Sequence, residues 1–552
     1  MTSRALFTSA ALMTAVLAIA CGESTEPAPL DGQPQTMRHH LQQFAANDSP
    51  IDEPGSPGEL RAIHYAKTYL ESLGLSTTIQ SVPLVRMIPV SSSVQVFAAA
   101  GSTHVTQTVT DNFIIWAGRQ NELVTLQAPV VFAGYGIVSP EYNRDDYKDA
   151  DVTGRIVVVL EGSPKTGSDD DLGTLGETYY GTRRYKYAEA ARHGASALLI
   201  VPGPDGAPWD ELQRTATGSI VNIDAAAVAH DAEPMPEIAG WISPAAAVRL
   251  FQAAGLDFAG LVVNAREAAF LPSPLSGLSV TLNMTSRKAR FTSHDLFAVL
   301  QGQTSEYVMV GGRWNELDPS AWTSTLTPPL GLQNPGELPS GAAGDAAAAV
   351  QASDDGSGAA AVMETARMLV TQHPRPLRSV VFMIATALTP GLVGLEYYMH
   401  HPLPSMPVDR LNGLIFLDHA DLSGTSARVG KIGTDSDEAL SQIARSAAIA
   451  QGRLFELDSN EEKRLFYKLS ETTLARDAVR TLYLTTRPEE DGSSRVLRYV
   501  ARRDQVAGQS GVMQEATPND PSRDPALLAR ITLRVANATN WPPRVEPVPP
   551  IR

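Results

Sequence analysis

The sequence predicts an α/β protein whose core is a doubly wound sheet. In the C-terminal half, short apolar runs alternate with segments of helical spacing, which is the order of a sheet with helices on its faces. One run, Val380–Ile384, is apolar throughout and leads to Pro390 and Gly391, as in a strand buried on both faces. Ligands of open α/β sheets bind beyond the carboxyl ends of such strands. Here that loop offers Leu388 and Thr389, which support neither acid–base nor metal chemistry at neutral pH.

Length and composition indicate a folded protein of more than one domain. The chain has 552 residues, of which 43% are hydrophobic and 19% charged, so it exceeds the size of a single hydrophobic core. Its net charge of −16 excludes nucleic-acid binding through a basic face. Beyond the N-terminus, no segment approaches the ~20 apolar residues of a membrane span.

Residues 1–20 have the pattern of a targeting segment, with a positive charge at Arg4 followed by an apolar run. The stretch Leu17-Ala18-Ile19-Ala20-Cys21 resembles the lipobox of bacterial lipoproteins, which implies cleavage before Cys21 and a lipid on its sulfur. Cys21 is the only cysteine, so it cannot form an internal disulfide. Residues 21–36, rich in Pro, Glu and Asp, are expected to be a solvated tether. The alternative is an ordinary secretory signal whose apolar run happens to end in cysteine.

Two helices and two stretches of strand are expected next. Apolar residues recur at helical spacing from Arg38 to Ala45 and from Glu59 to Leu73, and Gly74 is the expected C-cap of the second helix. The stretches Thr77–Phe97 and His104–Ile115 alternate as strands and hairpins do.

Residues 112–268 have the pattern of a separate unit. The segment Val130–Ile137 begins this unit, and Tyr147–Leu160 continues it. We expect a helix at Tyr187–His193 and a strand at Ala197–Val201 to follow. These segments resemble a protease-associated domain, an insertion found in several peptidase families. The resemblance implies a β-rich domain with no catalytic residue of its own.

The remainder of the chain alternates strands with helices. The expected strands are Leu296–Leu300, Val308–Val310, Val380–Ile384, Leu414–Leu417 and Thr481–Leu484, and the expected helices are Gly358–Leu369 and Glu396–His400. Residues 319–349, rich in Pro, Gly and Ala, are expected to form a long surface loop.

The order of these pieces resembles the two-zinc aminopeptidases of peptidase family M28. The framework segments that carry the resemblance are Gly134-Tyr135-Gly136, Ser353–Gly358, Gly391–Gly394 and Leu482–Leu484. It implies a peptidase-like α/β domain at 37–111 and 269–541, with a mixed sheet of zinc-exopeptidase (phosphorylase/hydrolase-like) type. A protease-associated insertion at 112–268 interrupts this domain, and a tail follows at 542–552.

Members of that family hold two zinc ions with His and carboxylate ligands, and a Glu acts as general base on the bridging water. Carried over position by position, the resemblance keeps two carboxylates, Asp354 as the bridging ligand and Asp418 at the second site. The replaced positions are three further ligands, now Arg313, Thr389 and Val500, and the general base, now Leu388. His419 is the last histidine of the chain, so no later residue replaces the missing one.

Two neighbouring carboxylates without a cation raise each other's pKa. We therefore hypothesise that the Arg313 guanidinium lies beside Asp354 and Asp418 and replaces zinc as their counter-ion. The alternative is that all three side chains point into solvent. His419 is expected to be a hydrogen-bonded neighbour rather than a metal ligand, and Ser357 to start the helix that follows it.

Three functions remain open from the sequence. The first is a catalytically impaired homologue, without a cofactor, that binds a peptide or protein or serves as a scaffold. The second is a metallopeptidase with a remodelled zinc site at Asp354, Asp418 and His419. The third is a hydrolase that needs no metal. In each case the lipid on Cys21 attaches the exported chain to the bacterial envelope, and Gly22 favours the outer membrane.

Overall fold

The structure is a computed structural model. It describes residues 34–45, 56–98, 105–107, 112–164, 172, 180–203, 208–216, 220–228, 234–314, 356–386, 392–421, 424, 426–431, 438–457, 479–486 and 522–541. Most of the described strands join one 15-stranded mixed sheet, which confirms the mixed α/β class.

Two helices begin the described chain, α1 (Pro34–Ala45) and α2 (Pro57–Ser72). The second helix begins at Pro57, two residues before the predicted Glu59. The Ser56 hydroxyl caps it there, because it accepts the backbone N–H of Glu59 at 3.1 Å and satisfies one of the N–H groups left open at a helix start. The helix ends before Gly74, whose φ of +81° is accessible to glycine at little cost. Both helix predictions are confirmed.

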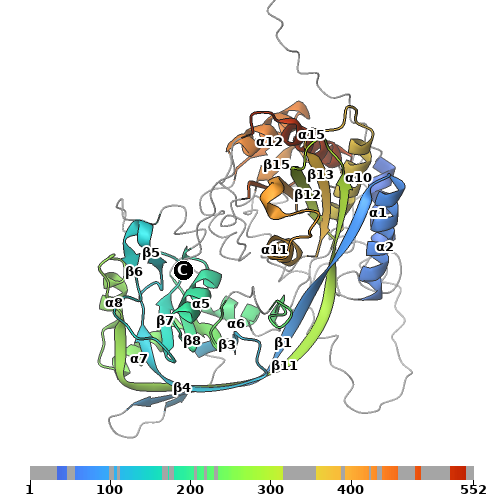
Figure 1. The fold of residues 1–552 in the computed structure, drawn as a ribbon. Helices are drawn as coiled ribbons and strands as arrows, with labels where there is room; N and C mark the ends of the chain where they lie inside the picture. The colour runs from blue at the N-terminus through green and yellow to red at the C-terminus, as the bar shows by residue number, and fades with distance from the viewer. Residues whose placement is uncertain are drawn as a thin grey trace, which may run out of the picture. The chain divides into compact units, whose positions relative to one another are not determined.

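A long antiparallel ribbon follows, made of β1 (Ser76–Ala98) and β11 (Ser273–Leu300). The two strands are paired from Ser76 opposite Val299 to Ala98 opposite Leu278, with one register shift after Pro89. Figure 1 shows them side by side along their length. The sequence predicted β1 nearly in full but only the last five residues of β11.

The described residues between β1 and β11 form further strands and four helices. The strands are β2 (Val105–Gln107), β3 (Phe113–Ala117), β4 (Leu123–Phe132), β5 (Val138–Ser139), β6 (Arg144–Asp145), β7 (Ile156–Leu160), β8 (Ala197–Val201), β9 (Ile220–Ile223) and β10 (Ile238–Ile242). The helices are α5 (Arg183–Arg192), α6 (Trp209–Ala216), α7 (Pro244–Ala253) and α8 (Phe258–Asn264), with a 3-10 turn at Pro140–Tyr142. Strands β4, β7, β8 and β10 pair in parallel in that order.

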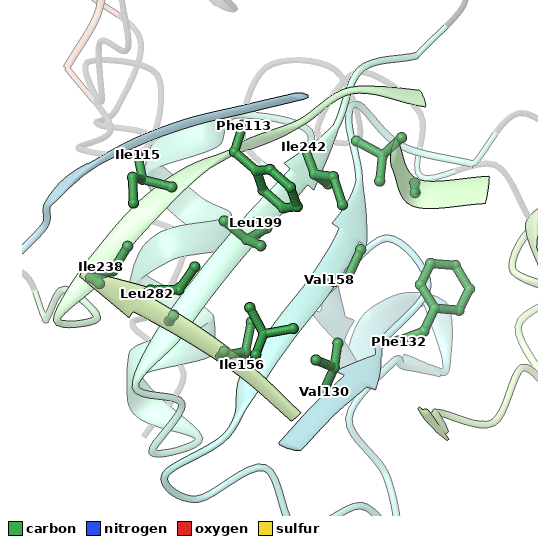
Figure 2. Close-up of a cluster of buried hydrophobic side chains, with 14 of the residues drawn as sticks. Phe113, Ile115, Val130, Phe132, Ile156, Val158, Leu199, Ile238, Ile242 and Leu282 are labelled. Carbon is green, nitrogen blue, oxygen red and sulfur yellow. The ribbon is translucent and has the colours of Figure 1, made fainter. Parts of the chain in front are cut away.

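An apolar cluster fills this insertion, and Figure 2 shows Phe113, Phe132, Ile156 and Leu199 converging within it. The predicted strand at Ala197–Val201 is confirmed to the residue. The helix predicted at Tyr187–His193 begins earlier, because the Thr182 hydroxyl accepts the Tyr185 N–H and caps it there.

Among its described residues, the C-terminal α/β region has six strands besides the end of β11, together with four helices. The strands are β12 (Tyr307–Arg313), β13 (Ser379–Ala385), β14 (Leu411–Leu417), β15 (Arg428–Lys431), β16 (Leu454–Glu456) and β17 (Thr481–Thr485). The helices are α10 (Ser357–Val370), α11 (Val393–His400), α12 (Glu438–Ala450) and α15 (Arg523–Asn537), with a 3-10 turn at Val408–Arg410. Every strand and helix predicted in the described part of this region is confirmed.

The sheet of this region is covered on both faces. Strands β13, β12, β14 and β17 are parallel neighbours in that order. Helix α11 packs on the apolar cluster that includes Met309, whereas α10 meets the sheet at Gly312, where a Cβ would overlap the Gly358 carbonyl oxygen. Since Met309 and Gly312 differ by an odd number of positions along one strand, they face opposite sides. This is the doubly wound arrangement that the sequence predicts.

The full strand order in the sheet is β16-β15-β17-β14-β12-β13-β11-β4-β7-β8-β10-β3, with β1 beside β11 and both β2 and β9 beside β1. Among the described helices, none by itself combines the length and apolar composition of a membrane span, although α7 and α8, joined by a sharp bend, reach them as a pair.

Candidate functional site

The site lies where two parallel strands end. Arg313 is the last residue of β12, and Asp418 and His419 directly follow β14. Because β12 and β14 are hydrogen-bonded neighbours that run in the same direction, their carboxyl ends meet at one edge of the sheet. The side chains of Arg313, Asp418 and His419 therefore come together there.

The three side chains form a closed cluster. The Arg313 Nε lies 2.9 Å from Asp418 Oδ1, and the His419 Nδ1 lies 2.9 Å from Asp418 Oδ2. The His419 Nε2 lies 2.6 Å from Arg313 Nη2. Since a guanidinium only donates hydrogen bonds, His419 Nε2 accepts from it, and Nδ1–H donates to the carboxylate. This assigns His419 as the neutral Nδ1–H tautomer.

All three groups are withdrawn from water, with exposed fractions of 1% for Arg313, 2% for Asp418 and 7% for His419. Burial alone would raise the pKa of Asp418, but the Arg313 guanidinium and the His419 ring beside it outweigh burial and hold that pKa well below its usual value. The carboxylate is therefore ionised throughout the neutral range, with Arg313 as its counter-ion.

These donors do not fit a zinc ion. Each oxygen of Asp418 already contacts a cation or an N–H donor. The Nε2 lone pair of His419 already accepts a hydrogen bond from the guanidinium. A second positive charge placed against them would meet Arg313 at close range. Within the described ranges, no three His, Cys, Asp or Glu side chains are grouped as a metal ion requires.

The structure thus confirms one half of the counter-ion hypothesis, the contact between Arg313 and Asp418. The other half concerns Asp354, which lies outside the described residues together with Leu388, Thr389, Val500 and Cys21. His419 lies within hydrogen-bond distance of both Asp418 and Arg313. 

Ser357 is the first residue of α10, as predicted, but Gly356 is the N-cap. The Ser357 hydroxyl accepts the N–H of Ala420 at 3.1 Å, so it also holds the loop after β14.

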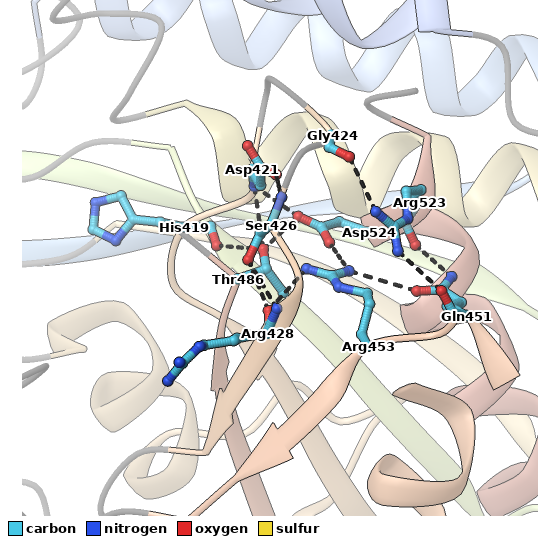
Figure 3. Close-up of polar contacts among 10 residues, drawn as sticks. All are labelled: His419, Asp421, Gly424, Ser426, Arg428, Gln451, Arg453, Thr486, Arg523 and Asp524. Carbon is cyan, nitrogen blue, oxygen red and sulfur yellow. Dashed lines mark hydrogen bonds and ion pairs between the residues drawn. The ribbon is translucent and has the colours of Figure 1, made fainter. Parts of the chain in front are cut away.

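A polar network that the sequence did not indicate supports the same loop (Figure 3). Thr486 donates its N–H to the His419 carbonyl at 3.2 Å, and its single hydroxyl proton is shared between that carbonyl, also at 3.2 Å, and a carboxylate. The Thr486 hydroxyl also bonds to Asp524 at the start of α15, and Asp524 forms a buried ion pair with Arg453 at 2.6 Å. Asp421 N–H donates to Asp524 Oδ2 at 2.6 Å. No sequence motif joins these residues, because they come from four separate elements.

Comparison with known proteins identifies the α/β region. Residues 295–495 match the model of peptidase family M28. The matched range contains Arg313, Asp418 and His419, so the cluster occupies the part of the chain that the family shares. A comparison with curated proteins found no match.

Among solved structures, the chain is similar to an aminopeptidase from Aneurinibacillus sp. strain AM-1, with 14% identity, coverage of 94% of this chain and 97% of that one, and a TM-score of 0.47. It is also similar to BSAP, a zinc aminopeptidase from Bacillus subtilis, with 13% identity, coverage of 93% and 99%, and a TM-score of 0.43. A peptidase M28 precursor from Shewanella amazonensis SB2B matches at 13% identity, with coverage of 94% and 99% and a TM-score of 0.37.

Proposed function

We propose that this chain is a catalytically impaired M28 homologue that acts as a binding or scaffolding protein. The observation that carries the proposal is the Arg313 guanidinium at 2.9 Å from Asp418, where the family resemblance implies a zinc ligand. A guanidinium has no lone pair for a metal, and its fixed charge neutralises the carboxylate that a zinc ion would otherwise need. A peptide or protein is the ligand class that the peptidase-like fold suggests.

The sequence supports this proposal independently. Leu388 stands at the general-base position, and removal of a general base alone typically lowers a rate by ~10²–10⁴-fold. Thr389 and Val500 remove further ligand positions. Loss of base and ligands together leaves the fold without the parts that activate water.

Zinc content is the direct test. Purified protein, and its Asp354→Ala variant as a matched control, are dialysed with zinc and analysed by mass spectrometry of metals. We expect well below one zinc per chain in both samples. Stoichiometric zinc that disappears in Asp354→Ala would contradict the proposal and favour the remodelled metal site. Amide or ester hydrolysis that survives chelation would instead favour the metal-independent hydrolase.

We also propose that the chain is an envelope lipoprotein anchored through Cys21. The support is the lipobox-like stretch that ends at Cys21 and the absence of any other cysteine in the sequence. One acyl chain gives only weak membrane binding, whereas the several chains of a lipoprotein anchor bind stably. We expect the wild-type protein to partition into detergent and the Cys21→Ser variant into the aqueous phase. Equal partitioning of both would refute the anchor.

A further inference from the structure

A second buried polar cluster lies where β13 ends. Its members are Glu59 on α2, Ser293 and Asp295 on β11, and Thr386 directly after β13, and each has an exposed fraction of 0%. Two carboxyl groups so fully removed from water require partners or protons. The sequence analysis did not single out any of the four, and the Arg313–Asp418–His419 cluster does not include them.

Glu59 is well supplied with hydrogen-bond donors. Its Oε1 lies 2.9 Å from the Ser293 hydroxyl and 3.1 Å from His294 Nδ1. The Ser293 hydroxyl also lies 2.8 Å from that of Thr386. Ser293 therefore connects the start of α2 to the residue that follows β13.

Asp295 on β11 also contacts Thr386, the residue that follows β13. Its Oδ1 accepts the backbone N–H of Thr386 at 2.9 Å, and the Thr386 carbonyl accepts the N–H of Gly394 at 3.0 Å. A Cβ at Gly394 would overlap the Asp295 carboxyl, so the carboxyl fits against the start of α11. Its Oδ2 has no hydrogen-bond partner among the residues that the structure describes.

The electrostatic surroundings favour a neutral Asp295. Burial raises the pKa of Asp295 well above its usual value, the Thr386 N–H lowers it, and the nearby Glu59 carboxylate raises it again. The other titratable groups are His294, which is paired with Glu59, and Tyr397 of α11, whose pKa is raised by burial and by Asp295. No Lys or Arg in the described part of the chain contributes to the shift at Asp295.

We propose that Asp295 is a proton-dependent latch between the end of β13 and the start of α11, closed only while its carboxyl is neutral. The neutral group fits between the end of β13 and the start of α11. After the proton is lost, the carboxylate has Glu59 as its nearest charged neighbour, so repulsion and the need for hydration open the contact. This inference does not depend on whether the chain binds zinc or hydrolyses peptides.

The sign of the pH effect follows from linkage. Because the folded pKa of Asp295 lies above the unfolded value, the folded state binds more protons between the two values, and stability falls as pH rises through that window. Asp295→Asn keeps the acceptor for Thr386 and has no proton to lose. The difference in melting temperature, variant minus wild type, should therefore be larger at pH 8 than at pH 5 by at least about 2 °C.

Hydrogen exchange locates the effect. After correction for intrinsic rates, peptides that contain Thr386 and Gly394 should lose protection with rising pH in wild type but not in Asp295→Asn. Asp257→Asn, at an exposed N-cap, is the control and should follow wild type. Equal pH dependence of these peptides in wild type and Asp295→Asn would overturn the proposal. If Asp295→Asn does not fold, Glu59→Gln should show a weaker pH dependence than wild type, and an unchanged one would also overturn it.

Discussion

Two buried Arg–Asp pairs, one in the α/β region and one in the insertion, have the same N–O distance, but the pKa values of their aspartates are shifted in opposite directions. Arg313 and Asp418 are 2.9 Å apart, and so are Arg144 and Asp146. Yet the pKa of Asp418 is held well below its usual value, whereas burial raises the pKa of Asp146 in spite of Arg144. The distance to a cation therefore does not decide the ionisation of a buried carboxyl.

The neighbours explain the difference. Asp418 has the His419 ring and the Tyr483 hydroxyl in addition to Arg313, and together they outweigh burial. Asp146 has Lys186 as its second cation, but burial lowers the pKa of that lysine to about 7, so its charge is only partial at neutral pH. In the Arg313–Asp418 pair the partners of the carboxylate therefore outweigh burial, whereas in the Arg144–Asp146 pair burial outweighs the partners.

Removal of each arginine should give the largest difference between the two pairs. Arg313→Met leaves Asp418 buried without its cation, which we expect to cost about 3–5 kcal/mol in the free energy of unfolding. Arg144→Met should cost about 1–3 kcal/mol, because Asp146 keeps Lys186 and the N–H groups of Tyr135 and Ile137. Urea unfolding followed by circular dichroism measures both.

A double variant provides the control for this prediction. Arg313→Met with Asp418→Leu removes both charges, and most of the lost stability should return. Equal losses for the two single arginine variants would show that the two pairs do not differ in the way described.

The pH dependence of the two aspartates should give a smaller effect with opposite signs. Because the folded pKa of Asp418 is lowered, its stabilisation is present above the usual value and is lost as pH falls below about 4. The difference in stability between wild type and Asp418→Asn should therefore shrink on going from pH 6 to pH 3. For Asp146, whose pKa is raised, wild type should lose stability relative to Asp146→Asn as pH rises above about 4. Slopes of the same sign in denaturant titrations at several pH values would contradict the comparison.

Local patterns predicted most of the α/β region. The continuous apolar runs at Val380–Ile384 and Leu414–Leu417 lie within β13 and β14. These strands could be predicted because a strand buried on both faces is a continuous apolar run, which can be recognised without knowledge of its neighbours in the sheet. The first 23 residues of β11 were not predicted, because their mixed polar and apolar residues form a strand through pairing with β1, which is far away in the sequence. The short strands β15 and β16 lie at the end of the sheet and have little apolar pattern.

Part of the candidate site could be predicted from the types of single residues. The family resemblance implies a metal ligand at position 313, so an arginine there draws attention, and its pairing with Asp418 is expected from their opposite charges. The supporting residues Asp524, Arg453 and Thr486 could not be found, because each is an ordinary residue until the fold brings it to His419. The buried Asp295 did leave a signal, since an aspartate within the apolar end of a strand pattern requires an explanation.

The β1–β11 ribbon determines how the regions of the chain are connected. Ser76 pairs with Val299, so the residues between them form one closed loop, and the entropy of closing a loop grows only with the logarithm of its length. Since the last five residues of β11 also pair with β13, one strand belongs to both the ribbon and the sheet of the α/β region. Strand β1 lies outside the family match and β13 lies within it, so β11 connects the matched and unmatched parts of the chain through backbone hydrogen bonds.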